Sequence, residues 1–238
     1  MENHSAAEAL TGAFTSALAA RSGEAVDYRA ITHPSVPNYL ALESGSTWGV
    51  ADDSYHSLPA ADLGHELTTA AVPWRAYMEG LGSQGCLNSP LPYDPGHNPF
   101  LFFGGGCPPN VVPFTRFAAD VSGPSPPRFL WITPDICHDE HNCSIATGDA
   151  WLRSTVSEIQ ASAAWTAGAV LFITWDEDDG SAGDNVLTLV VTPNDAHAVS
   201  HRPYDHYSLL ATIEDLLGVS RLAHAAQATP MTDLVPGG

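Results

Sequence analysis

Apolar residues recur along the chain in a pattern that alternates helices with short, wholly apolar strands. Leu10, Phe14 and Leu18 lie at helical spacing and predict an amphipathic helix over residues 6–22, ending near Gly23. The same patterns predict the elements that follow, in this order: strand 26–32, helix 35–42, helix 112–121, strand 129–133, helix 150–162, strand 169–175, strand 186–192 and helix 206–217. Because continuous apolar strands alternate with helices, we expect an α/β fold with a mostly parallel central sheet sandwiched by helices.

Residues 46–110 break this alternation and predict an irregular, loop-rich insertion. Glycine and proline punctuate the stretch, and one helical patch is predicted within it, over residues 67–81. The sequence shows neither an internal repeat nor a low-complexity tract. We therefore expect a single domain over residues 1–238, with the insertion shaping a ligand pocket.

The charge of the chain limits the partners that can be expected. All eight basic residues are arginines, against 27 aspartates and glutamates, and the net charge is −19. Nucleic acids bind through clustered cations, so we expect no nucleic-acid partner, and a Walker-type phosphate loop is excluded because it needs a lysine. No apolar run approaches the ~18 residues that span a bilayer. Stable membrane insertion is therefore not expected, and no protein partner is evident.

Four cysteines, at positions 86, 107, 137 and 143, permit three disulfide pairings. None of them forms a C-x-x-C pair, so neither a zinc knuckle nor a thioredoxin-like site is indicated. In an exported protein we expect disulfides, and the pairing with the shortest loops joins Cys86 to Cys107 and Cys137 to Cys143. Four buried free thiols are the alternative. The polar start of the chain shows no signal-peptide pattern.

Polar side chains follow the predicted strands, at the sheet edge where α/β proteins bind ligands. The stretches are HPSVPNY at 33–39, PDICHDEH at 134–141, DEDDG at 176–180 and, before the last helix, YDHYS at 204–208. Acids and histidines that converge on one edge suit a hard or borderline divalent cation. A hydroxyl at a helix N-terminus beside such a cation is suited to attack phosphorus.

Each of these motifs has a plainer interpretation when it is taken alone. The run from Asp176 to Asp179 is also typical of a solvated acidic turn. Asp205 and Ser35 are residue types that commonly cap helices. His138 and His141 are also compatible with the surface of a disulfide loop. Their joint occurrence at predicted strand ends favours an active site.

Six motifs together resemble the bacterial phosphoesterase family of the alkaline-phosphatase superfamily. That family contains secreted acid phosphatases, phosphatidylinositol-3-phosphatase-like enzymes and phospholipases C. The motifs are, in family order, ENHS at 2–5, HPSVPNYLALESG at 33–45, YDPGHNPF at 93–100, PDICHDEH at 134–141, FITWDEDDG at 172–180 and YDHYSLLATIEDLLG at 204–218. They cover nearly the whole chain and are specific as a set, whereas ENHS or YDHYSLL alone is not.

The resemblance implies a divalent metal ion as cofactor, of an identity that the sequence does not name. Glu2 and Asn3 match metal ligands, and Asp176 and Glu177 match the acidic pair that completes the site. Ser35 would lie on the same ion. Because the acidic run continues beyond this pair, the assignment of the second carboxylate can shift by one residue. Oxygen ligands suit Ca, Mg or Mn, and neighbouring histidines would admit Zn.

The resemblance also implies catalytic roles. Ser35, in a Ser-x-Pro-Asn frame, matches the nucleophile that forms a covalent phosphoenzyme, and Asn38 matches a residue that holds a phosphate oxygen. Asp139, His141 and His206 match polar residues that face the phosphate or a second metal. One of these histidines would protonate the leaving oxygen.

The implied function is metal-dependent hydrolysis of a small-molecule or lipid phosphate monoester through a phosphoserine, an acid-phosphatase type of activity that includes phosphoinositides. A phospholipase C-type diesterase and a non-catalytic, acidic, metal-binding extracellular module are the alternatives, and a Gly-x-Ser-x-Gly esterase elbow is absent. The insertion at 46–110 would shape the substrate pocket. His33 is close enough in sequence to Ser35 to contact the substrate, and His97 is interpreted as structural.

The start of the chain departs from the family pattern. Family members carry an apolar strand directly before the Glu-Asn motif and a signal peptide before that strand, and neither is present here. The resemblance implies an extracellular or periplasmic protein whose sequence is truncated at this end. Two explanations stay open. Either the true start lies upstream, or the fold lacks its first central strand and places Glu2 and Asn3 on a frayed terminus.

Overall fold

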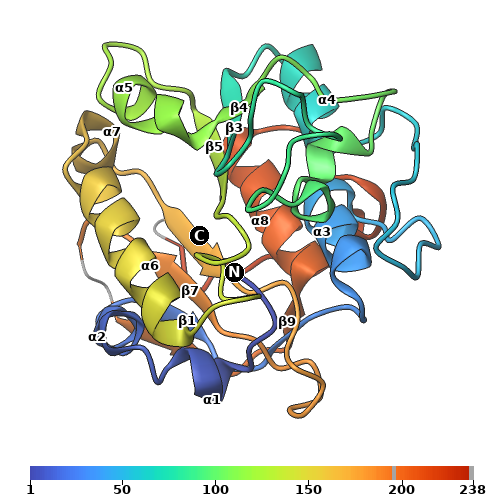
Figure 1. The fold of residues 1–238 in the computed structure, drawn as a ribbon. Helices are drawn as coiled ribbons and strands as arrows, with labels where there is room; N and C mark the ends of the chain where they lie inside the picture. Colours follow the sequence, from blue (N-terminus) through green and yellow to red (C-terminus); the bar gives the residue numbers. More distant parts are fainter. Residues whose placement is uncertain (195–196, 236–238) are drawn as a thin grey trace.

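Three small sheets lie at the centre of the computed structural model, which describes residues 1–194 and 197–235 (Figure 1). The strands are β1 Gly23–Ala25, β2 Tyr28–Arg29, β3 Trp74–Met78, β4 Val111–Pro113, β5 Phe129–Thr133, β6 Leu171–Thr174, β7 Thr188–Val191, β8 Ala198–Ser200 and β9 Tyr204–Asp205. Their order is β6-β7-β1-β8 in one sheet, β4-β3-β5 in the second and β2-β9 in the third. Two of these sheets therefore bring together strands that are distant in the sequence.

Strand pairing is mostly parallel, as predicted. Among the named strands, β3 is parallel to β4 and β5, β1 to β8, and β2 to β9, whereas β7 is antiparallel to both β1 and β6. The α/β class is confirmed, but the expected single sheet is divided into three. The N-terminal segment connects two of them, since the Glu2 amide donates to the Asp139 carbonyl and the Asp176 amide donates to the Met1 carbonyl. Residues 1–2 are thus held by backbone hydrogen bonds and are not frayed.

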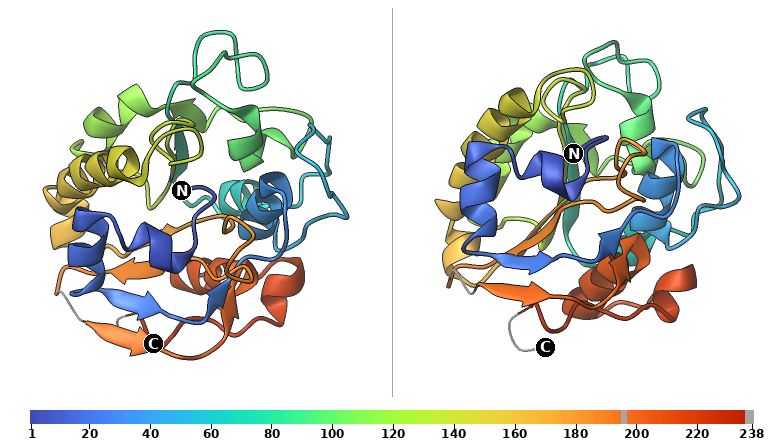
Figure 2. Two further views of the ribbon diagram at one scale, coloured as in Figure 1. Left: turned by 60° about the horizontal axis from the view of Figure 1, so that its bottom comes forward. Right: turned by 90° about the horizontal axis from the view of Figure 1, so that it is seen from below.

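Helices pack on both sides of the sheets (Figures 1 and 2). They are α1 Ala6–Ala9, α2 Ala13–Ala19, α3 Ser35–Ser44, α4 Leu63–Thr69, α5 Phe117–Val121, α6 Ile145–Gln160, α7 Ala163–Thr166 and α8 His206–Leu217, with short 3₁₀ turns at Pro95–His97, Pro99–Leu101, Phe114–Arg116 and Ala223–Ala226. Figure 1 shows α2 and α6 together on one side, and α3 and α8 together on the other. No helix within residues 1–194 and 197–235 is long and apolar enough to cross a bilayer.

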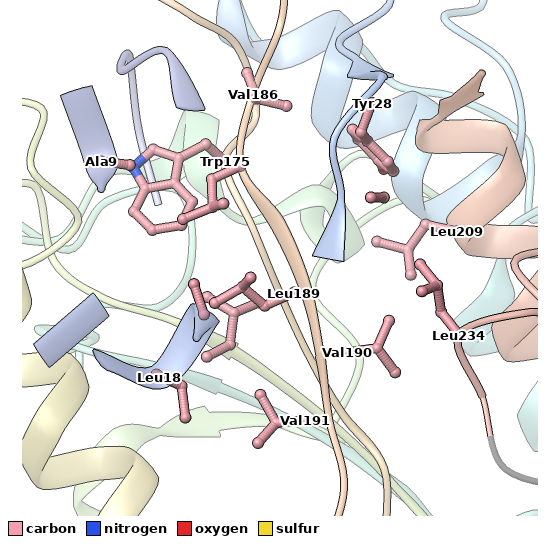
Figure 3. Packing of buried hydrophobic residues seen from close by; sticks show 14 of the residues in the cluster. Ala9, Leu18, Tyr28, Trp175, Val186, Leu189, Val190, Val191, Leu209 and Leu234 are labelled. Carbon is pink, nitrogen blue, oxygen red and sulfur yellow. The ribbon is translucent and has the colours of Figure 1, made fainter. Parts of the chain in front are cut away.

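Two large apolar clusters form the core. The first packs α2, α6 and the strands around β7, and includes Leu18, Leu189 and Trp175 (Figure 3). The second packs α3 and α8 on β3, with Leu40 and Leu210 among its buried members. Helix α8 takes part in both, because Leu209 belongs to the first cluster and its neighbour Leu210 to the second.

The helix predicted over residues 6–22 is in fact two short helices. Gly12 separates α1 from α2, and a Cβ at this position would lie 2.6 Å from the Asp149 carboxylate. That carboxylate, on α6, accepts hydrogen bonds from the Phe14 and Thr15 amides at 3.0 and 2.7 Å and from the Thr15 hydroxyl at 2.8 Å. Asp149 therefore caps α2 from a distant part of the chain, which apolar spacing alone does not reveal.

Replacing the cap residue, Asp149→Ala, is expected to lower the free energy of unfolding by about 2 kcal/mol, because two amides at the start of α2 lose their acceptor. Denaturant-induced unfolding measures the change. Ser154→Ala, at an exposed position of α6, is the control and should be nearly neutral. A loss no greater than in this control would show that Asp149 does not hold α2.

Three further predictions are corrected by the structure. The helical patch at 67–81 is the end of α4 followed by β3, which is largely buried because it is the central strand of its sheet. The helix at 112–121 is β4, a 3₁₀ turn and α5. Short apolar runs fit either secondary structure, and here pairing with β5 decides for the strand. The strand predicted over 26–32 is much shorter. Within that range only β2, Tyr28–Arg29, is a strand, and β1 precedes it at Gly23–Ala25.

Candidate active site

Helix α3 places Ser35 at its first turn, facing buried acids. Pro34 occupies the N-cap position, so Ser35 is the first helical residue and not the cap. At the other end Gly45 adopts a φ of 72°, a left-handed conformation that favours glycine, and the helix ends there, two residues beyond the predicted bound. The whole helix is buried, which fixes the direction in which the Ser35 hydroxyl points.

The Ser35 hydroxyl lies between two buried carboxylates from distant parts of the chain. Its oxygen is 3.3 Å from Glu2 Oε2 and 3.4 Å from Glu177 Oε1. Glu2 is fully buried, and its other oxygen accepts a short hydrogen bond from the Tyr39 hydroxyl. The predicted nucleophile and two of the predicted metal ligands are therefore brought together.

Asp176 and Asn3 complete this group of oxygens. The Asn3 amide donates to Asp176 Oδ1 at 3.3 Å. The remaining side-chain oxygens, Asp176 Oδ2 and Asn3 Oδ1, are buried and without a hydrogen-bond partner in the described part of the chain. Buried polar atoms are almost always paired, so two unpaired oxygens in one acidic site indicate that a ligand belongs there.

The electrostatics of the site point the same way. Burial raises the pKa of Glu2 to about 8, and the neighbouring Asp139 adds to the effect. Burial followed by the charge of Asp176 raises the pKa of Glu177 to about 7, and burial also raises the pKa of Asp176. Three carboxylates crowded into a buried site favour protonation unless a cation is present. Oxygen donors of this kind fit a hard divalent cation.

The acidic run does not form a solvated turn. Glu177 and Asp178 are buried, whereas Asp179 is exposed. Asp178 accepts hydrogen bonds from backbone amides of its own loop, at Gly180, Ala182 and Asp184. Of the two neighbouring acids, only Glu177 reaches Ser35, which is the geometry expected for the predicted pair of Asp176 and Glu177.

Asn38 lies one helical turn after Ser35 and is fully buried. Its Nδ2 donates to the Thr32 carbonyl at 2.6 Å and to Glu177 Oε2 at 3.0 Å, and its Oδ1 accepts from the Ile31 and Thr32 amides. In this arrangement the side chain orients Glu177 and the turn that precedes α3. The predicted contact between Asn38 and a phosphate oxygen stays a prediction.

Asp139 and His97 form a second buried layer beside Glu2. Asp139 accepts from His97 Nδ1 at 2.9 Å, and His97 Nε2 lies 3.6 Å from Glu2 Oε2. Glu2, His97 and Asp139 place ligand atoms within 4.8 Å of one another, close enough to hold a metal ion. Sequence reasoning gave His97 a structural role, and its place in the YDPGHNPF motif was the signal that could have marked it as part of the site.

A cavity of about 90 Å³ opens beside Ser35. It is lined by Ser35, Val36, Asp53, Asp94, Gly96, His97 and His141. His141 is exposed, and its ring lies 5.6 Å from that of His97. The structure thus brings His141 to the pocket, along with two acids that the sequence did not single out, Asp53 and Asp94.

Two other predicted histidines lie outside the lining of this cavity. His206 is fully buried behind the acids, where one ring nitrogen bonds the Asp176 carbonyl at 2.6 Å and the other the Tyr28 hydroxyl at 2.9 Å. Burial lowers the pKa of His206 to about 4, so this ring is neutral and positions Asp176. His33 is exposed enough to reach solvent and lies 3.3 Å from Glu177 Oε2.

Both disulfides of the shortest-loop pairing are present, Cys86–Cys107 and Cys137–Cys143. The second closes the loop that follows β5, where the Asp139 amide donates to the Asp135 carbonyl and the His141 amide to Asp139 Oδ1. This disulfide therefore holds the segment that carries two residues of the site.

Removal of the two disulfides should have different effects on stability and on turnover. Cys137→Ser/Cys143→Ser opens a loop of sequence separation 6 and is expected to cost about 2 kcal/mol of stability, against about 3 kcal/mol for Cys86→Ser/Cys107→Ser, whose separation is 21. Turnover should fall more in the first variant, because Asp139 loses its support. Denaturant unfolding and phosphatase assays of both variants test this prediction, in which one variant loses more stability and the other more turnover. Equal losses of turnover would contradict it.

Comparisons with known proteins identify the family and the fold of the chain. The model of the Phosphoesterase family matches residues 16–220. A phosphatidylinositol-3-phosphatase of Mycobacterium tuberculosis is 33% identical over 226 residues, which are 93% of this chain and 75% of that protein. A phosphate-repressible acid phosphatase of Penicillium chrysogenum is 30% identical, over 82% of this chain and 52% of its own length. This chain therefore spans about half the length of that fungal relative.

One solved structure shares the fold. It is a protein in the alkaline phosphatase superfamily from Vibrio parahaemolyticus, with a TM-score of 0.65, 10% identity and coverage of 93% of this chain and 66% of that chain. At this identity the likeness concerns the fold alone. The prediction of an alkaline-phosphatase-like α/β fold is confirmed, and so is the resemblance drawn from the six motifs.

Proposed function

Because the chain belongs to the phosphoesterase family, we propose that it hydrolyses phosphate monoesters with Ser35 as the nucleophile and a divalent cation as cofactor. The observation that carries this proposal is the position of the Ser35 hydroxyl, at the N-terminus of α3 and within 3.4 Å of two buried carboxylates. A helix N-terminus attracts the phosphate group, and the acids provide the cation site beside it.

Glu2, Asn3, Asp176 and Glu177 would hold the cation. Oxygens of Glu2 and Glu177 lie within 3.4 Å of the Ser35 hydroxyl, and the Asn3 backbone amide bonds Asp176. Asp176 Oδ2 and Asn3 Oδ1 are buried and lack partners in the described chain. When bound, the cation supplies positive charge that stabilises the charge developing on the phosphoryl oxygens and on the Ser35 oxygen. Asn38 keeps Glu177 in place through its 3.0 Å hydrogen bond.

The reaction has two steps. Ser35 Oγ attacks phosphorus and gives its proton to one of the two carboxylates beside it, Glu2 or Glu177. The bond to the ester oxygen breaks, and the departing alcohol takes a proton from His141 on the pocket wall. Water then gives a proton to His141 and attacks the phosphoserine, and the serine oxygen leaves with the proton held by the carboxylate. Inorganic phosphate is released, and both groups are back in their starting states. Asp139 would orient the His141 backbone through the 2.9 Å hydrogen bond between them.

The small pocket favours a monoester over a diester. The cavity beside Ser35, of about 90 Å³, has room for a phosphoryl group, and a second ester arm would have to extend beyond it. The M. tuberculosis relative is named for a phosphoinositide, and a lipid headgroup is one substrate class that we propose. Both disulfides suit an oxidising compartment, so we also propose an extracellular or periplasmic location.

The proposal is tested by assaying an aryl phosphate monoester against the matching bis-aryl diester. The purified protein is treated with a chelator, and Mg, Mn, Ca and Zn are restored one at a time. Monoester turnover that disappears on chelation and returns with one of the metals supports the proposal. Turnover of the diester alone would favour the phospholipase C alternative. Metal binding without turnover of either ester would favour the non-catalytic module.

A further inference from the structure

Asp53 is an exposed residue of the loop between α3 and α4, yet its carboxylate reaches the nucleophile helix. Asp53 Oδ1 accepts a hydrogen bond from the Val36 amide at 3.1 Å. Val36 directly follows Ser35 in the first turn of α3, and both residues line the cavity together with Asp53. The carboxylate thus lies in the pocket, on the first turn of the helix that carries the nucleophile.

The position that Asp53 holds is one that phosphate needs. The first amides of a helix have no partner within the helix and attract anions, and α3 is ten residues long. A phosphoryl group bonded to Ser35 Oγ lies within reach of the next amide, that of Val36. In the structure the Asp53 carboxylate already accepts the hydrogen bond of this amide.

A second observation points to a ligand next to this cavity, on the side of Ser35 where Asp176 lies. Asp176 Oδ2 is buried beside Ser35 and has no hydrogen-bond partner among the described residues, and Asp176 itself is only 2% exposed. The residues that line the cavity include two acids and neither arginine nor lysine. An entering phosphate therefore meets a wall that carries two carboxylates, and one of them, Asp53, bonds an amide of α3.

We propose that Asp53 is a specificity-determining residue that competes with phosphate for the N-terminus of α3. The proposal rests on the proposed function, because it concerns the same pocket. Asp53 leaves the Val36 amide when a phosphate ester binds and returns when the product dissociates. Its carboxylate thereby weakens the binding of inorganic phosphate, the product that a cation and a helix N-terminus would otherwise retain.

The test is the binding of inorganic phosphate to the metal-loaded protein, measured by calorimetry, which requires no turnover. Asp53→Asn keeps an oxygen that can accept from Val36 but removes the competing charge, and it is expected to bind phosphate about tenfold more tightly than the unmodified chain. Asp52→Asn is the matched control. It removes the same charge one residue away, where the carboxylate bonds Ser54 and His56 and not α3. Its phosphate affinity should stay within about twofold of the unmodified chain.

Turnover supplies the second measurement. In Asp53→Asn the KM for an aryl phosphate should fall and inhibition by inorganic phosphate should increase, whereas Asp52→Asn should show neither change. Thermal unfolding of both variants establishes that α3 is intact. Equal or weaker phosphate binding by Asp53→Asn overturns the inference, as does equal tightening in both variants. If the unmodified chain binds phosphate but does not hydrolyse the ester, the proposed function fails. The calorimetric comparison of the two variants still decides whether Asp53 competes with phosphate.

Discussion

Ser35→Ala is expected to lower phosphate monoester turnover by about 10⁴-fold or more, because no other hydroxyl of the pocket wall is placed to form the phosphoenzyme. The change removes one oxygen from a buried site and leaves α3 otherwise intact. Steady-state kinetics with an aryl phosphate measure the loss. Rapid quenching of the unmodified chain in acid, followed by peptide mass analysis, should locate a phosphoryl group on Ser35.

Ser44→Ala is the control for this prediction. Ser44 lies on the same helix and is equally buried, but its hydroxyl donates to the Leu40 carbonyl at the opposite end. That variant should retain turnover even if it is somewhat less stable. If Ser35→Ala kept a substantial part of its activity, a water molecule and not Ser35 would be the attacking nucleophile.

Glu2→Gln is expected to abolish turnover while stabilising the metal-free protein at pH 8. Burial raises the pKa of Glu2 from 4.5 to about 8 in the folded chain. Between these two pH values the folded state keeps a proton that the unfolded state has lost, so the free energy of unfolding falls as pH rises. For one group the slope is about 1.4 kcal/mol per pH unit. Glutamine cannot ionise and removes this slope, but it also removes a carboxylate from the cation site.

Unfolding of the metal-free proteins between pH 4.5 and 8 measures the effect, and the two stabilities should converge at the acidic end. Glu214→Gln is a matched control. Burial also raises the pKa of Glu214 to about 8, but this residue lies on α8 and accepts from the Leu222 amide, away from Ser35. It should gain stability at pH 8 and keep both metal binding and turnover. A Glu2→Gln variant with normal turnover would remove Glu2 from the cation site.

Elements set by local patterns could be predicted from the sequence. Strand β5 and helix α8 have the predicted bounds, and α3 begins at Ser35 as expected. In each case the decisive information lies within the segment, as an apolar run, a capping acid such as Asp205, or a closing glycine such as Gly45. The family motifs added the convergence of Glu2, Ser35 and Glu177, which no local pattern contains.

What the sequence did not reveal depends on distant partners. Strands β8 and β9 are two or three residues long and exist because they pair with β1 and β2. Asp53 looks like any exposed loop acid until its bond to Val36 is seen. His97 joins the site only because the loop after β5 brings Asp139 against it. Such contacts cannot be read from hydrophobic periodicity, since they are set by the packing of the whole chain.

The two apolar clusters of the core have one more consequence. Ser35 is followed by Val36 of the second cluster, whereas Asp176 follows Trp175 of the first, so the nucleophile and the acids meet at the seam, the boundary between the two clusters. A small displacement of one cluster relative to the other would separate the nucleophile from the acids while both clusters stay folded. In a denaturant titration, catalytic inactivation should therefore precede the loss of helical circular dichroism, and coincident transitions would argue that the seam is as rigid as the cores that it joins.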